Sequence, residues 1–153
     1  MLFAPFQLIE HLKAETKEDK RRAYEIIKEN RTSKGYPLKM TWEQVLSTVE
    51  NVAKADFFIT KTNDLESSAA IVFHINSHTV QVIYWGANPH GEKCNVMYYM
   101  PFKVMEYYKN IGIRYIDIGP SSELGNVSLG LNDFKQVIGS TNTLKETWIY
   151  NND

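Results

Sequence analysis

The segment TVQVIYWGANPHGEKCNVMYYMPFKVMEYYKNIGIRYIDIGP, from Thr79 to Pro120, decides the fold of this chain. Its patterning predicts a strand over 79–85, a loop over 86–94, a helix over 95–110 and a strand over 113–118. Because a helix connects the two strands, we expect them to be parallel neighbours in one sheet. Small and polar residues follow both strand ends, where open α/β sheets place their ligand sites.

Two helices are predicted upstream of this segment. Residues 17–31 place apolar side chains on one face at helical spacing, and residues 2–12 fit either a first strand or a short helix. Thr41 is expected to cap the second helix and to form a capping box with Gln44. The buried stripe of that helix is expected to consist of Trp42, Val45, Leu46 and Val49.

The residues between the second helix and Thr79 predict strands. The runs 56–60 and 69–75 are rich in apolar, β-branched and aromatic residues, and polar turns follow at 63–64 and 76–78. Connections this short join antiparallel strands, so the two runs and the 79–85 strand should form a meander.

The remaining expectations concern helix limits and the C-terminus. Pro101 should either kink the 95–110 helix or mark the start of its regular part, and Gly112 should end it. Val96, Met100, Val104, Tyr107 and Ile111 are expected to face inward. A short helix over 131–138, ended by Gly139, and a last strand over 144–150 complete a single predicted α/β domain, residues 1–153, with a mixed sheet flanked by helices.

Composition restricts the function classes. The 153 residues carry 17 basic and 18 acidic side chains, so the net charge of −1 provides no overall field to attract nucleic acid or an anionic membrane. Cys94 is the single cysteine, which excludes an intrachain disulfide. The histidines lack the spacing of a metal site. No apolar run approaches the roughly 18 residues of a membrane span. We therefore expect a cytoplasmic protein without a metal.

The loop 86–95 is the first candidate site. Free backbone N–H groups at a strand-to-helix connection form an anion site, to which Lys93 would add a charge, although a flexible connection is an equally good interpretation. A phosphate-binding NTPase loop is rejected, because Glu92 precedes Lys93 and Cys94 replaces the metal-binding hydroxyl. No GxSxG elbow is present, and Cys94 has no evident histidine partner, so a hydrolase is disfavoured.

Polar residues after the 113–118 strand are the second candidate site. Asp117 could act as a base or orient an amine, whereas a carboxylate that caps the next turn is the more favoured interpretation. Ser121 could be only a turn former. Lys135 could stabilise an oxyanion, although a solvated helix lysine is the usual alternative.

Several motifs together resemble the GNAT N-acyltransferases, and most closely their FemAB-like branch in a single-domain form. The resemblance covers roughly residues 20–150, and its most specific parts are DIGPS and the GL, FK and IG pairs that follow. The motifs are YEIIKENR (24–31), GYPL (35–38), DFF (56–58), VQVIYWG (80–86), YYK (107–109), DIGPS (117–121) and GL, FK and IG (130–139).

The resemblance implies a donor site between the 79–85 and 113–118 strands, which diverge in GNAT enzymes. The expected donor is an acyl-CoA, with acetyl-CoA first. The usual [Q/R]-x-x-G-x-[G/A] pyrophosphate motif is missing from residues 86–96, as in Fem-type enzymes, which take aminoacyl groups from tRNA. The donor thus stays open between acyl-CoA, aminoacyl-tRNA and none. The donor-binding residues that we expect are Trp85, Gly86, Lys93, Asn95 and Val96.

The resemblance also implies that Lys135 lies near the reacting carbonyl. In the mechanism that we expect, a chain of waters or a carboxylate such as Asp117 accepts a proton from the amine, and Tyr84 or Tyr115 supplies modest acid help to the leaving thiolate. The acceptor would be an amine of a small molecule or cell-wall precursor, bound by Arg31, Ser121 and Phe134. Fem-type proteins carry two such domains with the acceptor between them, so this chain is expected to form a homodimer, to be part of a larger protein, or to act without that cleft. A catalytically degenerate GNAT-fold binding module is the alternative function.

Overall fold

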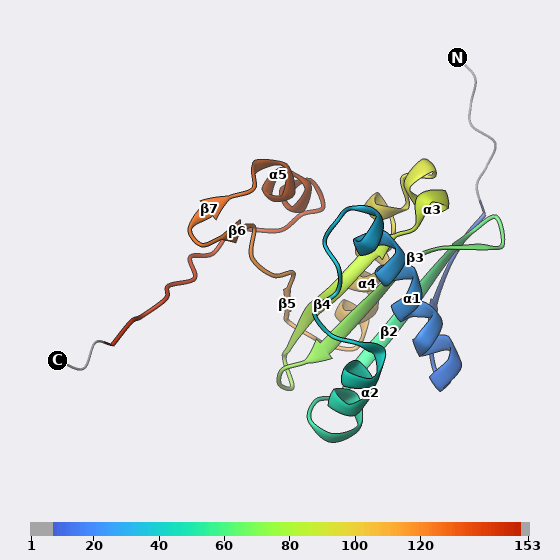
Figure 1. Cartoon of the computed structure of the whole chain (residues 1–153), viewed down its shortest axis with the longest axis horizontal. Helices are drawn as coiled ribbons and strands as arrows, with labels where there is room; N and C mark the ends of the chain where they lie inside the picture. Colours follow the sequence, from blue (N-terminus) through green and yellow to red (C-terminus); the bar gives the residue numbers. More distant parts are fainter. Residues whose placement is uncertain (1–7, 151–153) are drawn as a thin grey trace, which may run out of the picture. The chain divides into compact units, whose positions relative to one another are not determined.

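The computed structural model describes residues 8–150, which divide into two compact units, residues 8–119 and 120–150. The first unit contains a five-stranded sheet of order β1-β2-β3-β4-β5 (Figure 1). Only the β4–β5 pair is parallel, which confirms the predicted mixed, mostly antiparallel sheet. The strands are β1 (Ile9–Lys13), β2 (Ala55–Thr62), β3 (Leu65–His74), β4 (Thr79–Ala87) and β5 (Tyr115–Asp117).

Two helices, α1 (Lys17–Ser33) and α2 (Trp42–Asn51), precede the meander as predicted. The backbone N–H of Gln44 donates to the Thr41 hydroxyl at 3.3 Å, and the Thr41 N–H donates to the Gln44 side chain at 2.9 Å. The predicted capping box is thus confirmed. For the ambiguous stretch 2–12, residues 9–12 belong to strand β1, and residues 2–7 lie outside the described part.

Apolar side chains fill a core on each face of the sheet, because successive strand residues point to opposite faces. The α1 and α2 side of the core contains Ile27, Val45, Phe57 and Ile71 among others. Of the predicted α2 stripe, Trp42 and Val45 are buried, and Leu46 and Val49 pack against the same cluster in half-buried positions. The α4 side is built from Phe58, Ala70, Val72, Val80, Val82, Met100, Val104 and Tyr108.

The crossover between β4 and β5 differs from the prediction in two respects. The predicted 86–94 loop contains a short helix, α3 (Pro89–Lys93), and the single helix expected over 95–110 is split into η1 (Val96–Tyr98) and α4 (Met100–Asn110). Asn88 caps α3 and Pro89 occupies its first turn, a combination that favours helix initiation.

Pro101 lies in the first turn of α4, so it marks the start of the regular helix. The break at η1 leaves the predicted inward residues Val96, Met100 and Val104 buried, and one core assignment is wrong because Ile111 follows the last residue of α4. Ile111, expected to face inward, is 52% exposed, whereas Tyr108 is fully buried at 0%. The helix ends before Gly112, as predicted.

The second unit holds α5 (Leu129–Val137), close to the predicted helix, and a hairpin of β6 (Ser122–Glu123) and β7 (Asn126–Val127) that was not predicted. The hairpin turn is formed by Leu124 and Gly125, both at positive φ. The strand predicted over 144–150 is wrong, because this segment has no regular structure. Its apolar side chains are exposed, and no strand among residues 8–150 pairs with it.

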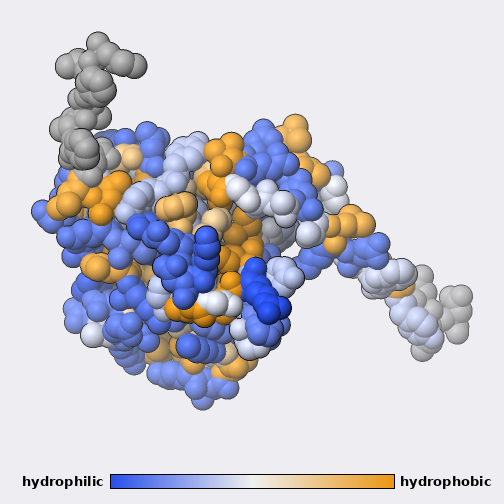
Figure 2. Space-filling model, turned by 180° about the vertical axis from the view of Figure 1, so that it is seen from behind, coloured by the Kyte–Doolittle hydropathy of each residue, from blue (hydrophilic) through white to orange (hydrophobic). Residues whose placement is uncertain are grey.

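Figure 2 views the molecule from behind, where apolar and hydrophilic atoms are mixed on the surface. The exposed apolar side chains of the crossover include Tyr98 and Phe102. Among the described residues, no helix combines the length and the apolar character that crossing a bilayer requires.

A buried carboxylate connects three strands and α4. Asp56 on β2 is 3% exposed and forms an ion pair with Lys13 of β1 at 2.9 Å. It accepts a hydrogen bond from the Tyr108 hydroxyl at 2.9 Å and contacts His74 of β3 at 2.6 Å. Burial alone would raise the pKa of Asp56, but hydrogen bonds from Lys13, His74 and Tyr108 outweigh it and lower the pKa below its ordinary value.

Replacing the Asp56 carboxylate should therefore destabilise the first unit. We expect Asp56→Asn to lower the free energy of unfolding by about 2 kcal/mol, because an amide replaces the buried carboxylate that accepts hydrogen bonds from Lys13 and Tyr108. Urea denaturation followed by circular dichroism measures the change. Asp64→Asn is the matched control, because Asp64 lies in a turn at φ +65°, where asparagine is well tolerated. Equal stability of the two variants would contradict the structural role of Asp56.

His11 predicts a pH dependence of stability. Its ring stacks on Phe58 at 5.2 Å and its Nε2 is buried without a partner among the described residues. Burial, with a smaller contribution from the charge of Lys103, lowers the pKa of His11 to about 4. The folded state thus resists protonation of His11 at pH values between about 6.5, the pKa of histidine in the unfolded chain, and about 4. The free energy of unfolding therefore decreases as the pH falls through this range.

The free energy of unfolding should consequently be about 2 kcal/mol lower at pH 5 than at pH 7. His11→Gln should remove most of this difference, whereas His78→Gln in the exposed 76–78 turn should retain it. Urea denaturation of the unmodified chain and of both variants at pH 5 and pH 7 measures these differences. An unchanged pH dependence in His11→Gln would show that another group is responsible.

Candidate functional site

Strands β4 and β5 pair over only three residues. Thr79 lies opposite Tyr115, and Gln81 lies opposite Asp117, where the pairing ends. Strand β4 continues to Ala87, so the edge formed by residues 82–87 has no β5 partner among the described residues. This is the predicted divergence of the parallel pair. It leaves an edge of backbone N–H and C=O groups to which an extended ligand can bind.

A bulge lies within the same stretch of β4. The register between β3 and β4 shifts between Ile71, opposite Tyr84, and Val72, opposite Val82, which leaves Ile83 as the extra residue. Bulges of this kind bend a strand and redirect its side chains. The candidate donor-binding residue Trp85 then packs against the core on the α4 side, and Tyr84 packs on the α1 side.

The end of β4 is held by α1 through a close contact. The side-chain amide of Asn30, which is buried, donates to the Ala87 carbonyl at 2.6 Å. A Cβ atom at Gly86 would lie only 2.6 Å from Asn30 Oδ1, so this approach requires glycine. The sequence alone did not predict this contact between Asn30 and the end of β4.

Helix α3 is docked on β3 just as closely. The side chain of Asn88 accepts from the N–H of Gly91 at 2.9 Å and donates to the Glu66 carbonyl at 2.8 Å. A Cβ atom at Gly91 would lie 2.0 Å from the Ser67 carbonyl oxygen. The order Asn-Pro-x-Gly could have indicated this capped helix, because Asn at the N-cap followed by Pro is a helix start.

Lys93, Asn95 and Val96 lie together where α3 passes into η1. Lys93 and Asn95 are exposed, and Asn95 has left-handed backbone geometry with φ +54°. No side chain caps η1, and the backbone N–H groups of Val96 and Met97 donate to no acceptor among residues 8–150. Uncapped amides beside a lysine can bind an anion such as a phosphate.

Cys94 does have a histidine neighbour, contrary to the sequence-based expectation. His90 Nε2 lies 4.0 Å from the Cys94 sulfur and 3.1 Å from the Thr62 carbonyl oxygen. Because a carbonyl oxygen only accepts, Nε2 must carry a proton in that hydrogen bond and cannot take one from the thiol. The pair therefore lacks the geometry of an activated nucleophile.

Asp117 is exposed at the end of β5. Its carboxylate accepts from the backbone N–H of Gly119 at 2.7 Å and from the side chain of Gln81 at 3.3 Å. This is the turn-capping arrangement that the sequence favoured. The capped carboxylate lies at the point where the β4–β5 pairing ends.

Arg31 follows Asn30 on the last turn of α1. Its side chain is half-buried, and its Nε is buried without a hydrogen-bond partner among the described residues. A buried guanidinium N–H without an acceptor is costly, and a carboxylate or phosphate of a ligand could satisfy it.

Ser121, Phe134 and Lys135 belong to the second unit, residues 120–150. Lys135 is 5% exposed, and its ammonium donates to the Pro120 carbonyl at 2.9 Å. It is thus a buried residue, unlike a solvated helix lysine. The Ser121 carbonyl accepts from the N–H of Ser128 at 2.8 Å, which closes the hairpin onto α5.

No family model and no curated protein sequence matches the chain. Solved structures do. A possible acetyltransferase from Clostridium difficile 630 has a TM-score of 0.66 at 13% identity, over 94% of this chain and 97% of that one. A predicted acetyltransferase from Clostridium acetobutylicum, solved with acetyl-CoA, has a TM-score of 0.62 at 15% identity, over 95% and 96% of the two chains.

An aminoglycoside acetyltransferase, meta-AAC0020 from an uncultured soil metagenomic sample, was solved in complex with sisomicin. Its TM-score is 0.64 at 10% identity, over 96% of each chain. At sequence identities this low, the structural similarity establishes a shared fold and nothing more. The chain therefore has the fold of the GNAT acetyltransferases.

Proposed function

We propose that this chain is an N-acyltransferase that takes an acyl group from acyl-CoA, with acetyl-CoA as the first candidate, and transfers it to an amine. The observation that carries the proposal is the free edge of β4 over residues 82–87. It supplies main-chain groups for an extended donor, in a fold whose solved examples include proteins with bound acetyl-CoA and CoA. An acyl-CoA donor fits the cytoplasmic location expected from the sequence.

The donor would lie along β4 and end at η1. The amide groups of its pantetheine arm would hydrogen-bond to the free edge that includes Trp85 and Gly86. Its pyrophosphate would meet the connection at Lys93 and Asn95, both exposed, and the uncapped amide of Met97, whereas Val96 is buried at 1% exposure. This connection would take the place of the pyrophosphate motif that the sequence lacks.

Transfer would proceed by direct attack. The amine nitrogen attacks the thioester carbonyl carbon, the carbon–sulfur bond breaks, and the thiolate leaves with a proton from Tyr84 or Tyr115. Asp117 or a chain of waters would accept the amine proton, and Lys135 would stabilise the oxyanion. Arg31 would bind an anionic group of the acceptor, with Ser121 and Phe134 as further contacts, so an amine that also carries a carboxylate or phosphate is the preferred substrate class.

Acetyl-CoA binding is the first prediction of this proposal. Calorimetric titration should give a Kd in the micromolar range, and Lys93→Met should weaken binding about fivefold, because it removes one charge beside the pyrophosphate. Lys109→Met is the matched control, since Lys109 is equally exposed but lies at the far end of α4. Desulpho-CoA should bind comparably, because the thiol does not contribute to the pyrophosphate site.

Absence of binding at millimolar acetyl-CoA would overturn the acyl-CoA donor. Aminoacyl-tRNA, which the FemAB-like motifs suggest, would then be the donor to test, and failure of both would leave the non-catalytic binding module. Equal effects of Lys93→Met and Lys109→Met would show that the pyrophosphate does not meet η1.

Lys135 gives a second prediction. If its ammonium stabilises the oxyanion, Lys135→Gln should lower kcat about 100-fold and leave the Kd for acetyl-CoA unchanged. Stopped-assay kinetics with an amine panel measures kcat, and thermal unfolding checks that the variant folds. Lys145→Gln, outside any helix or strand, is the control. A parallel loss of donor binding and folding would assign Lys135 to structure, through its bond to the Pro120 carbonyl.

A further inference from the structure

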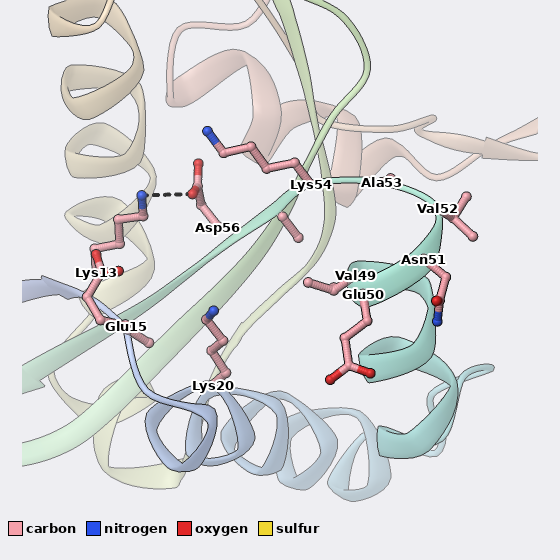
Figure 3. Close-up of a pocket in the computed structure, with 12 residues that line it drawn as sticks. Lys13, Glu15, Lys20, Val49, Glu50, Asn51, Val52, Ala53, Lys54 and Asp56 are labelled. Atoms are coloured by element: carbon pink, nitrogen blue, oxygen red, sulfur yellow. Dashed lines mark ion pairs between the residues drawn. The ribbon is translucent and has the colours of Figure 1, made fainter.

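A pocket lies in the first unit, away from the free edge of β4. It is lined by the end of β1, the first turn of α1, the last turn of α2 and the start of β2 (Figure 3). The start of β2 at Ala55 pairs with Phe73 near the end of β3, whereas the end of β4 at Ala87 pairs with Ser68 near the start of β3. The pocket is thus at the opposite end of the sheet from the proposed pyrophosphate site.

The charges that line this pocket are balanced. Lys13 and Asp56 pair with each other at 2.9 Å, which leaves two lysines and two glutamates. None of these four forms an ion pair or a side-chain hydrogen bond with another described residue. They are Lys20, Lys54, Glu15 and Glu50. A pocket with unpaired charges of both signs favours a ligand that carries both signs as well.

Within the pocket, one positive and one negative side chain lie at the ends of two different helices. Lys20 lies near the N-terminus of α1, where the helix dipole favours an anion, and it is half-buried. Glu50 lies at the C-terminus of α2, where the dipole favours a cation. Figure 3 shows these two side chains approaching the same space from the two helices. The lining also includes the apolar residues Ala14 and Val49.

We propose that this pocket binds a small zwitterion of the α-amino acid class, with its carboxylate toward Lys20 and its ammonium toward Glu50. The volume of about 560 Å³ lies within the range of roughly 300–1,000 Å³ that is usual for small-ligand sites. The lining residues do not include any part of β4, so this site would be separate from the proposed donor site.

The test is NMR titration of the full, ¹⁵N-labelled chain with each of the twenty common L-amino acids up to about 10 mM. At least one should shift amide resonances of residues 13–20 and 49–56. Lys20→Met and Glu50→Gln should each weaken that binding about fivefold or more. The matched controls Lys28→Met and Glu43→Gln change exposed residues of the same two helices outside the pocket. They should leave the affinity for the amino acid unchanged.

Three results would overturn the proposal. The first is the absence of shifts at these amides with every amino acid. The second is that inorganic phosphate alone reproduces the shifts, which would indicate a simple anion site. The third is unchanged affinity in both pocket variants. Acetyl-CoA titration of the same variants separates this site from the donor site, because Lys20→Met should bind acetyl-CoA as the unmodified chain does.

Discussion

The carboxylate of Asp56 is the interaction on which the geometry of the first unit depends. It accepts from Tyr108 and Lys13 and contacts His74, so one side chain of β2 joins β1, β3 and α4. Burial and the adjacent carboxylate raise the pKa of Tyr108, which keeps this hydroxyl a donor. With Tyr108 held, the end of α4 is fixed over the sheet, and the chain enters β5 only a few residues later. The position of α4 thus determines where the parallel pair begins.

The other end of β4, beyond its pairing with β5, is held by different contacts. Asn30 binds the Ala87 carbonyl, and the approach at Gly86 leaves no room for a side chain. Helix α3 then packs on the Ser67 carbonyl through Gly91. Strand β4 is therefore held by α1 and β3 along residues 82–87, while β5 has already ended. An open strand edge next to a well-packed backbone is a suitable surface for an extended ligand, because little order has to be created on binding.

Local sequence signals predicted the elements well where each signal acts within a few residues. The Thr41–Gln44 capping box, the turn at residues 63–64 and the helix end at Gly112 are of this kind. Errors arose where the outcome depends on where an element ends or on what it pairs with. Ile111 was expected on the buried face of the helix, but it follows the last residue of α4 and is exposed. The apolar residues 144–150 suggested a strand, although pairing, not composition, defines one.

The candidate site was predictable as a region and not as a set of contacts. Composition identified the 86–96 connection and the end of the 113–118 strand. The link between Asn30 and Ala87 spans 57 residues, and that between Asp117 and Gln81 spans 36, so neither follows from spacing along the chain. Only the folded sheet brings these partners together. The catalytic roles of Lys135, Asp117 and Tyr84 stay predictions.

The hydrogen bond from Asn30 to Ala87 has a consequence for how two substrates would influence each other. Arg31, the next residue, has a buried Nε without a partner among residues 8–150. An anion that engaged Arg31 would restrain the last turn of α1, and through Asn30 it would restrain the end of β4 as well. Whichever ligand arrives first would take up the small freedom that this strand end retains, so the second would lose slightly less entropy than the first. Occupancy of either position would thereby increase affinity at the other, by the same factor in both directions.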